Sequence, residues 1–428
     1  MNSAARRELV FGVFCLLFIL ALFLRTSTAV IVEDLMADFA IPAAALGLLA
    51  SAIFYAYSMS QLPVGMLSDH IGVRSTVAIF GLLGAAGSLL FAFSPGIQMA
   101  TWARVLTGVG TAGIWVPALK YLSLAYRPEE FATRTSIVST VGSLGLLIAT
   151  LPLAMLVERV GWRFPFILAG SVLLVLIVIA WLLMGGRSAP KRKTGAAEVV
   201  EDKSAGGVSQ SHTPFWRHPI FWRFALWAFL IYGVQFSFQG LWGAAYLQKT
   251  YGISREVAGS HLLFTSLGVL IGGVFWGLLS DRYFRARRPV LLIGTLGMLG
   301  SWIVMASLSS YPGLFFTSLL YFFLGIFGIV FLINFSCVKE IFPVEKAGMA
   351  IGAINTFMLL GTGVYQGVTG YMIDYFLKTG NALTAYRAIF YLYLGSIIVA
   401  FCLVLIMPET YHHRKQSRQL ADQAGLKS

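Results

Sequence analysis

Two arginines lie inside apolar stretches of this sequence, Arg25 and Arg104, and either could bind an anion. A charge at the centre of a membrane-spanning helix costs at least about 2.5–3.5 kcal/mol, so such residues usually face a wet interior. A guanidinium holds a carboxylate by two parallel hydrogen bonds. Thr28 shares the helix face of Arg25 at i+3, which predicts that both contact an anionic substrate. The alternative is that Arg25 extends to the outer membrane interface, near Glu33 and Asp34.

Arg104 shares one face of its helix with Thr107, Gly108 and Thr111, at i+3, i+4 and i+7. We interpret Arg104 and Thr111 as substrate-binding residues. The alternative for Arg104 is a buried, hydrogen-bonded side chain that supports helix packing. Lys120, near the inner end of the same helix, is interpreted as a base at the membrane interface.

The second half of the chain carries polar stripes in place of buried charges. On one helix the stripe holds residues at i, i+3, i+7 and i+10, which are Tyr232, Gln235, Gln239 and Trp242. On another the residues at i, i+7 and i+11 are Asn355, Thr362 and Gln366. These side chains are predicted to contact the polar body of the substrate. The alternative is that they form hydrogen bonds between helices.

None of the 18 acidic residues falls near the middle of an apolar stretch. The cavity is therefore predicted to be positive, which suits an anion and repels cations. A proton-coupled carrier needs a titratable group, and the nearest candidates are His261 and Glu340, although the interpretation of both as interfacial residues is favoured. No P-loop, metal-ligand cluster or nucleophile constellation is present, so we expect no cofactor, no metal site and no enzyme activity.

The composition is that of a membrane protein. Of 428 residues 58% are hydrophobic and only 11% are charged, against about 25% in soluble domains. The net charge of +13 does not indicate nucleic-acid binding, because the basic residues lie in short loops between apolar runs. The three cysteines have no metal-like spacing. We expect the lipid bilayer and a small anionic molecule as partners, and a monomer.

Apolar runs of about 20 residues predict membrane-spanning helices. Twelve such runs are found, at 9–32, 42–66, 75–94, 98–123, 133–157, 163–184, 221–247, 257–280, 289–309, 313–338, 347–375 and 384–407. A charged stretch followed by Gly, Ser and acidic residues separates the sixth run from the seventh. The predicted organisation is an all-α membrane protein with a six-helix bundle at 1–184, a cytoplasmic linker at 185–219, a second bundle at 220–410 and a cytoplasmic tail at 411–428.

The distribution of basic residues predicts the orientation of the chain. With both termini inside, the inner segments hold most of the Lys and Arg residues, which is the arrangement that cytoplasmic loops favour. The outer loops hold only Arg159, Arg163, Lys249, Arg255, Lys378 and Arg387. We therefore expect a multi-pass protein of the cell inner (plasma) membrane with both termini cytoplasmic.

Two loops at equivalent places of the two halves share a pattern. The first reads Gly65-Met-Leu-Ser-Asp69-His-Ile-Gly72-Val-Arg74, and the second Gly277-Leu-Leu-Ser-Asp281-Arg282. Glycines allow a short turn and close backbone approach. The pattern resembles the loop signature G-x-x-x-D-(R/K)-x-G-(R/K)-(R/K) of the major facilitator superfamily. The resemblance implies a gating role for Gly65, Asp69, Gly72, Arg74, Gly277, Asp281 and Arg282.

Further segments are similar to the same superfamily. They are Arg104-Val-Leu-Thr-Gly108, Tyr126-Arg-Pro-Glu129 and Gly161-Trp-Arg163. The resemblance implies two six-helix bundles around a central site. Arginines on the first and fourth helices also resemble the organic-anion branch, in which both line the anion site and the place of Thr111 often holds Glu. That implies uptake of a small carboxylate by alternating access.

Two other functions stay open at this point. A multidrug proton antiporter is one, but the predicted fifth helix lacks the Gly-Pro pair that such antiporters carry and has proline only at Pro152. A membrane sensor on the same fold is the other, although the cytoplasmic segments are short for an output domain.

Overall fold

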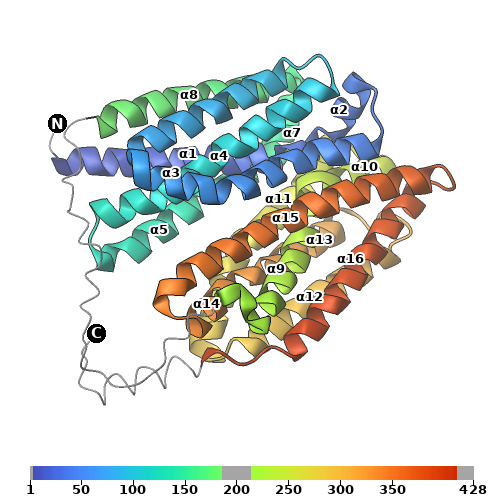
Figure 1. The fold of residues 1–428 in the computed structure, drawn as a ribbon. Helices are drawn as coiled ribbons and strands as arrows, with labels where there is room; N and C mark the ends of the chain where they lie inside the picture. The colour runs from blue at the N-terminus through green and yellow to red at the C-terminus, as the bar shows by residue number, and fades with distance from the viewer. Residues whose placement is uncertain (1–2, 186–213, 412–428) are drawn as a thin grey trace.

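The computed structural model describes residues 3–185 and 214–411, and all the regular structure in these ranges is helical (Figure 1). Most of the predicted linker at 185–219 and nearly all of the predicted tail at 411–428 therefore lie outside the described residues. The first half contains α1 to α8 and the second half α9 to α16.

The elements of the first half are α1 (Ser3–Thr26), η1 (Ser27–Val30), α2 (Val32–Phe39), α3 (Ala43–Ala92), α4 (Ile97–Ala125), α5 (Pro128–Gly142), α6 (Leu144–Ile148), α7 (Leu151–Val160) and α8 (Arg163–Met184). Those of the second half are η2 (Phe215–Arg217), α9 (Pro219–Ser237), η3 (Phe238–Trp242), α10 (Gly243–Tyr251), α11 (Arg255–Leu278), η4 (Leu279–Tyr283), α12 (Arg288–Ser307), α13 (Leu314–Gly328), η5 (Ile329–Phe331), α14 (Leu332–Ile341), α15 (Val344–Leu377) and α16 (Ala382–Leu405).

Within the described ranges, ten helices are long and apolar enough to cross a membrane, or eleven if one bent pair counts as a single span. The bent pair, Thr133–Ile148 and Leu151–Val160, meets at 44° and covers the run predicted at 133–157. The 50-residue helix α3 contains both runs predicted at 42–66 and 75–94. At 1.5 Å per residue the path of α3 through its two segments is about 75 Å, more than twice the hydrocarbon thickness.

Helix α3 changes direction at Gly72, whose φ of 82° and ψ of 163° are not helical. A residue with a Cβ atom would be strained there. The expectation that Gly72 forms a turn is therefore confirmed. The companion expectation for Gly65 is wrong, since this residue lies within α3 and a Cβ added to it would meet no atom within 4 Å.

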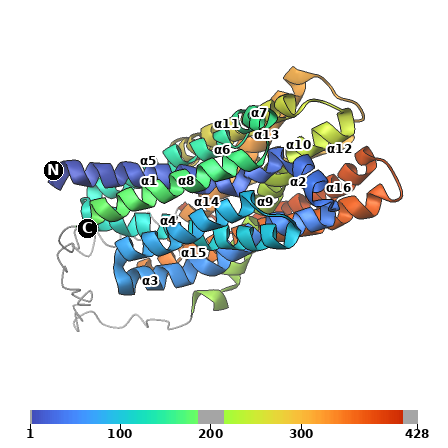
Figure 2. The same ribbon diagram turned by 90° about the horizontal axis from the view of Figure 1, so that it is seen from above.

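The two halves pack against each other mainly through α3 with α15 and α7 with α11. Helices α3 and α15 lie side by side in Figure 1, and α7 lies next to α11 in Figure 2. Small residues allow α3 and α15 to approach closely. A Cβ added to Gly47 would lie 2.4 Å from the carbonyl oxygen of Gln366, and one on Gly370 would lie 2.5 Å from that of Ala43. Any residue larger than glycine at position 47 or 370 would therefore clash with the backbone of the facing helix.

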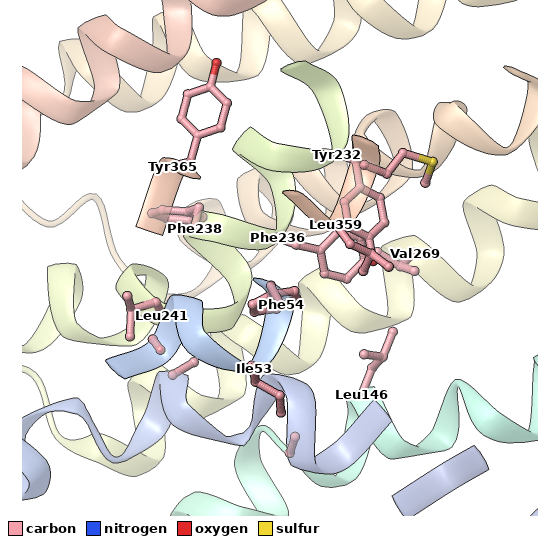
Figure 3. Packing of buried hydrophobic residues seen from close by; sticks show 14 of the residues in the cluster. Ile53, Phe54, Leu146, Tyr232, Phe236, Phe238, Leu241, Val269, Leu359 and Tyr365 are labelled. Carbon is pink, nitrogen blue, oxygen red and sulfur yellow. The ribbon is translucent and has the colours of Figure 1, made fainter. Parts of the chain in front are cut away.

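One continuous apolar cluster joins the halves, as Figure 3 shows. Ile53, Phe54 and Leu146 come from the first half, and Tyr232, Phe236, Leu241, Val269 and Leu359 from the second. Burial of such side chains gives about 1.5–3 kcal/mol each relative to water. The polar residues described below are held in place by this apolar frame.

Candidate functional site

Arg25, near the C-terminal end of α1, is 9% exposed and has no hydrogen bond or ion pair with any residue that the structure describes. Its guanidinium carbon lies 5.0 Å from the ring centre of Tyr57 on α3. Taking a charge out of water costs several kcal/mol unless it is paired. Glu33 and Asp34, which the alternative interpretation offered as its partners, pair with Lys249 and Arg255 instead.

Tyr57, which is 4% exposed, lies against Arg25. Tyr232 on α9 is 8% exposed and lies within range of the charge of Arg25. The Tyr232 ring stacks on Phe236 at 4.3 Å and meets Phe331 edge-on at 4.8 Å. Arg25 and Tyr57 of the first half are thus in contact, and Tyr232 of the second half lies within range of the Arg25 charge. Tyr57 was not predicted as a site residue, because a single tyrosine in an apolar helix does not indicate a binding site.

Arg104 is placed quite differently from Arg25. It is 1% exposed, its Nη1 donates to the carbonyl oxygen of Leu24 at 2.9 Å, and its Nη2 donates to the hydroxyl of Thr28 at 2.7 Å. Its guanidinium carbon also lies 4.1 Å from the ring centre of Phe91. These contacts tie α4 to the junction of α1 and η1. The geometry favours the interpretation that Arg104 supports helix packing, and Thr28 is engaged with it.

The hydroxyls on the Arg104 face turn back onto their own helix. Thr107 donates to the carbonyl of Ala103 and Thr111 donates to that of Thr107, both at 2.8 Å. Such bonds are common for threonine in buried helices. The Thr111 hydroxyl therefore bonds only to the backbone of its own helix in the described structure, and no bond connects it with Arg25.

The stripe on α9 and η3 forms a chain of hydrogen bonds that crosses the molecule. Gln235 Nε2 donates to Gln239 Oε1 at 3.3 Å, and Gln239 Nε2 donates to the hydroxyl of Ser266 on α11 at 3.1 Å. Ser266 in turn donates to the carbonyl of Leu146 in α6 at 3.3 Å. Gln239 lies in the π-helical turn η3, and such turns are frequent at functional sites. The chain links the second half to the bent helix of the first.

The other predicted polar residues of the second half differ in whether their side chains have hydrogen-bond partners. Trp242 donates its indole N–H to Thr369 at 2.8 Å, which ties it to α15. Thr362 and Gln366, 0% and 1% exposed, each have a side-chain oxygen with no hydrogen-bond partner among the described residues. A buried oxygen left in this state costs about 1–3 kcal/mol. Asn355 is half-buried on the same helix.

The first signature loop is open to solvent. The Asp69 side chain is 72% exposed, and its Oδ1 accepts from Lys120 Nζ at 2.7 Å. Lys120 also donates to the carbonyl of Ser68 at 2.6 Å. Arg74 stacks on Trp181 of α8, with 3.7 Å between its guanidinium carbon and the ring centre. Lys120 is thus the partner of Asp69, and Arg74 fastens the same segment to α8.

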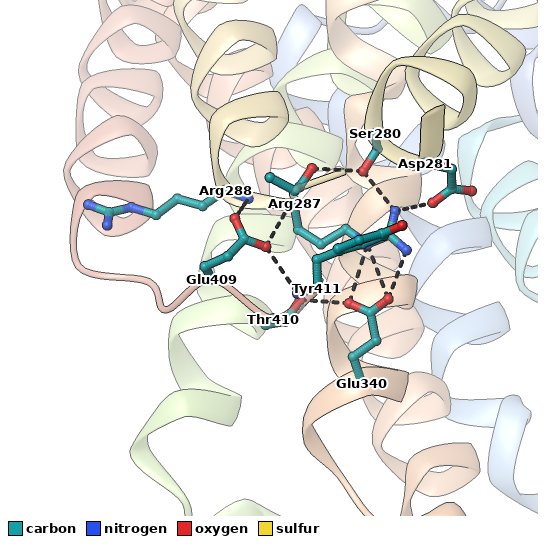
Figure 4. Close-up of polar contacts among 9 residues, drawn as sticks. Ser280, Asp281, Arg287, Arg288, Glu340, Glu409, Thr410 and Tyr411 are labelled. Carbon is teal, nitrogen blue, oxygen red and sulfur yellow. Dashed lines mark hydrogen bonds and ion pairs between the residues drawn. The ribbon is translucent and has the colours of Figure 1, made fainter. Parts of the chain in front are cut away.

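The second signature loop is built around a buried arginine, Arg287, which is 4% exposed (Figure 4). Its guanidinium binds Asp281, the Ser280 hydroxyl at 2.7 Å and Glu340 Oε1 at 2.7 Å. Burial lowers the pKa of Arg287, but the carboxylates of Glu340 and Asp281 raise it by more, so the net direction is upward. Arg282, the residue expected from the signature, is exposed.

The C-terminal end of the described chain completes this network. The Glu409 carboxylate accepts from the backbone N–H groups of Arg287 at 2.8 Å and Arg288 at 3.0 Å, where α12 begins. An acid at a helix N-terminus is favourable. Thr410 donates to Glu340 Oε2 at 2.8 Å. Arg287, Glu409 and Thr410 are not among the predicted site residues, since nothing in the local sequence brings position 409 to the start of α12.

The two coupling candidates are both buried in the protein. His261 is 0% exposed, with Nδ1 at 2.9 Å from the Ser318 hydroxyl and Nε2 at 3.0 Å from the Tyr311 hydroxyl. Glu340 is bound by Arg287 and Thr410 as described above. Among the described residues, no group of three or more His, Cys, Asp or Glu is arranged to hold a metal ion.

Comparison with known proteins gives one family. A family model described as Major Facilitator Superfamily matches residues 13–254 and 234–426. The chain is 26% identical over 365 residues to the membrane sensor protein UhpC of Salmonella typhimurium (strain LT2), covering 80% of each chain. It is 24% identical over 372 residues to the D-galactonate transporter of Escherichia coli O6:H1, covering 81% of this chain and 85% of that one.

A solved structure shares the fold. It is the crystal structure of a bacterial homolog to the human lysosomal transporter Spinster, in an inward-facing and occupied conformation. The two superpose with a TM-score of 0.75 at 17% identity, covering 95% of this chain and 97% of that one.

Proposed function

Because the chain belongs to the major facilitator superfamily, whose members are membrane transporters and not enzymes, we propose that it carries a small organic anion, a carboxylate, into the cell by alternating access. The relative named a D-galactonate transporter supports an acid as the cargo. The observation that carries the proposal is the state of Arg25. Apart from the ring of Tyr57, this buried cation has no hydrogen-bond or ion-pair partner among the described residues.

A bound carboxylate would supply the counter-charge and the hydrogen-bond acceptors that the buried Arg25 guanidinium lacks. It supplies the missing negative charge, and its two oxygens match the fork of the guanidinium. Tyr57 and Tyr232 add hydroxyl donors from opposite halves, so an anion held by all three would draw the halves together. Arg104 then acts by fixing the end of α1, one residue from Arg25, through the carbonyl of Leu24.

The polar body of the substrate is assigned to the second half. Gln235 and Gln239 offer amides, and the buried oxygens of Thr362 and Gln366 need donors. A hydroxyl or amino group on the substrate satisfies such oxygens at no further desolvation cost to the protein. The substrate expected from both ends of the site is a carboxylate that also carries hydrogen-bond donors.

The proposed topology has twelve spans, with α3 crossing the membrane twice and turning at Gly72. Both termini are cytoplasmic in a cell inner (plasma) membrane, on the distribution of basic residues. The domains are 1–184, the linker 185–219, 220–410 and the tail 411–428, in a monomer. The end of the bundle that holds α2 and α10 then faces outward.

The test is a binding and transport assay on purified protein. A panel of hydroxylated and aromatic carboxylic acids is compared with cationic drugs by thermal shift, since a ligand at 100 times its Kd adds about 2.7 kcal/mol of stability. Hits are then tested for uptake into proteoliposomes. We expect acids to bind and to be carried. Stabilisation by cationic drugs alone would replace this proposal with multidrug export.

A sensor is the second candidate function, because one relative is named a membrane sensor protein. A sensor and a transporter can bind the same anion, so binding alone does not separate them. Proteoliposomes do: a sensor stabilised by an acid moves none of it, whereas a transporter does. Arg25→Gln is the matched control, since it abolishes either response without removing the fold.

A further inference from the structure

One hydrogen bond deep in the described molecule joins a side chain of the second half to the backbone of the first. Ser266 of α11 donates to the carbonyl oxygen of Leu146 in α6 at 3.3 Å. Ser266 and Leu146 are 1% and 5% exposed, and Leu146 belongs to the apolar cluster that the halves share (Figure 3). Ser266 lies about three turns into α11, which begins at Arg255. The contact is therefore well inside the bundle, away from its charged ends.

The Leu146 carbonyl accepts from another helix because its own helix breaks directly after α6. Pro152 lacks an N–H group, and its ring would clash with the Ile148 carbonyl of a continuous helix. Thr150, two residues earlier, has φ of −110° and ψ of −119°, which are not helical. A continuous α-helix would pair the Thr150 N–H with Leu146, but this group donates to the Leu147 carbonyl at 3.2 Å. The break thus leaves the Leu146 oxygen for a donor from outside.

A carbonyl oxygen only accepts hydrogen bonds, and this sets the direction of the hydrogen-bond chain that ends on it. Ser266 has one hydroxyl proton, which it gives to Leu146, so it can only accept from Gln239. Gln239 must then turn its Nε2 toward Ser266, at 3.1 Å, and its Oε1 toward Gln235. Gln235 gives its Nε2 to that oxygen at 3.3 Å. The start of the hydrogen-bond chain is therefore the Gln235 Oε1, an acceptor.

The Gln235 oxygen has no hydrogen-bond donor among the described residues. It lies against Gly328, where α13 ends and η5 begins, and a Cβ atom on that glycine would clash with it. Tyr232 lies on the same face of α9 one turn earlier and within range of the Arg25 charge. The unpaired acceptor is thus on the helix face that the proposed anion site uses.

We infer that Ser266 is a positioning residue that makes the Gln235 end of the site an acceptor, so that the protein selects hydroxylated anions over anions that offer only an acceptor at that place. The inference rests on the proposed function, since it concerns the polar body of the anion held at Arg25. Without Ser266 the Gln239 amide is able to turn over. Gln235 can then present either its oxygen or its N–H groups, and the preference for a donor is lost.

The experiment measures dissociation constants of four acids by isothermal titration calorimetry on purified full-length protein. The acids form two pairs, 3-hydroxybenzoate with 3-methoxybenzoate and gluconate with hexanoate. The second acid of each pair lacks the hydroxyl donor, and 3-methoxybenzoate keeps the oxygen as an acceptor. In the wild type we expect the hydroxylated acid of a pair to bind about 5- to 150-fold more tightly, the effect of leaving a buried acceptor unpaired.

Four variants test whether this preference comes from the hydrogen-bond chain. In Ser266→Ala and in Gln239→Met the preference should fall below about 3-fold, whereas Ser266→Thr, which keeps the hydroxyl, should retain it. Thr265→Val is the matched control, because this buried hydroxyl of α11 bonds to the His261 carbonyl of its own helix. A preference caused by the size of the methoxy group would persist in Ser266→Ala. Gln239→Met carries the same test if Ser266→Ala does not fold.

Two results overturn the inference while the proposed function stands. They are a wild type without preference for the hydroxylated acids, and a preference that survives in both Ser266→Ala and Gln239→Met. In either case binding that is lost in Arg25→Gln still supports the anion site. If none of the four acids binds in a manner that depends on Arg25, the proposed anion site and this inference fail together.

Discussion

The two halves of the protein use buried charge in opposite ways. In the first half two cations lie deep among apolar side chains, and one of them, Arg25, has only the ring of Tyr57 beside it and no hydrogen bond or ion pair in the described structure. In the second half the deep residues are neutral, and the buried cation Arg287 lies at the end of the bundle among carboxylates. A fully paired arginine stabilises a fold, whereas an unpaired one is poised to bind.

The signature loops repeat this difference. Asp69 and Asp281 occupy the same place in the pattern and both are mostly exposed, at 72% and 62%, yet Asp69 pairs with a half-buried lysine while Asp281 pairs with Arg287, which is 4% exposed. Exposed pairs contribute about 0–1 kcal/mol, and breaking a buried one costs about 3–5 kcal/mol. The first loop is thus free to exchange partners during a transport cycle, and the second holds its half together.

The largest effect is expected for Arg287→Ala. It leaves Glu340 and Asp281 without their counter-charge, so the free energy of unfolding should fall by about 3–5 kcal/mol. The measurement is unfolding of detergent-solubilised protein. Arg282→Ala, an exposed arginine of the same loop, is the control and should change stability by less than about 0.5 kcal/mol. Equal losses of stability in the two variants would show that the buried ion pairs of Arg287 contribute no more than the exposed Arg282 does.

The next effect concerns substrate affinity at Arg25. Arg25→Lys keeps the charge but loses the two-bond fork, and charge-assisted bonds are worth about 1.5–3 kcal/mol, so Kd should rise about 10- to 150-fold, nearly as much as in Arg25→Gln. Affinity is measured at fixed pH and salt. Arg104→Lys, treated in the same way, should lower stability more than affinity. If Arg25→Lys binds like wild type, Arg104 becomes the principal anion-binding residue.

A smaller effect is expected for the exposed loop. Asp69→Asn should slow transport in proteoliposomes by about 2- to 5-fold, the equivalent of a pair worth up to 1 kcal/mol, while folding and membrane insertion stay intact. Lys120→Gln should match it, because the two side chains are each other's partners. Unchanged transport in both variants would remove the gating role from this loop.

The smallest effect is expected on the final level of accumulation. With no carboxylate near the middle of any predicted span, the protein should equilibrate or exchange the anion, or couple transport to a peripheral group such as His261 or Glu340. In the first case an imposed pH gradient should alter the rate of transport but not the final level of accumulation. Accumulation that vanishes in His261→Gln would identify this histidine as the proton site. Accumulation that survives both His261→Gln and Glu340→Gln contradicts the prediction.

Much of the architecture follows from local sequence. Apolar runs of about 20 residues predict the spans because insertion into a bilayer depends on the hydropathy of each segment alone. Gly72, Asp69 and Asp281 could be identified from a short pattern, and Arg25 and Arg104 from charge within apolar runs. The same motifs also predicted the family, and the match to the family model confirms that prediction.

Only the tertiary structure separates the roles of the two arginines. Arg104 is satisfied by a carbonyl 80 residues away in the chain, Arg25 lies beside an aromatic ring on another helix, and Arg255 meets a carboxylate 221 residues away. Nothing in their neighbouring residues distinguishes them. The free energy of a buried charge depends on which atoms surround it, and in a helical bundle those atoms come from distant segments brought together by packing.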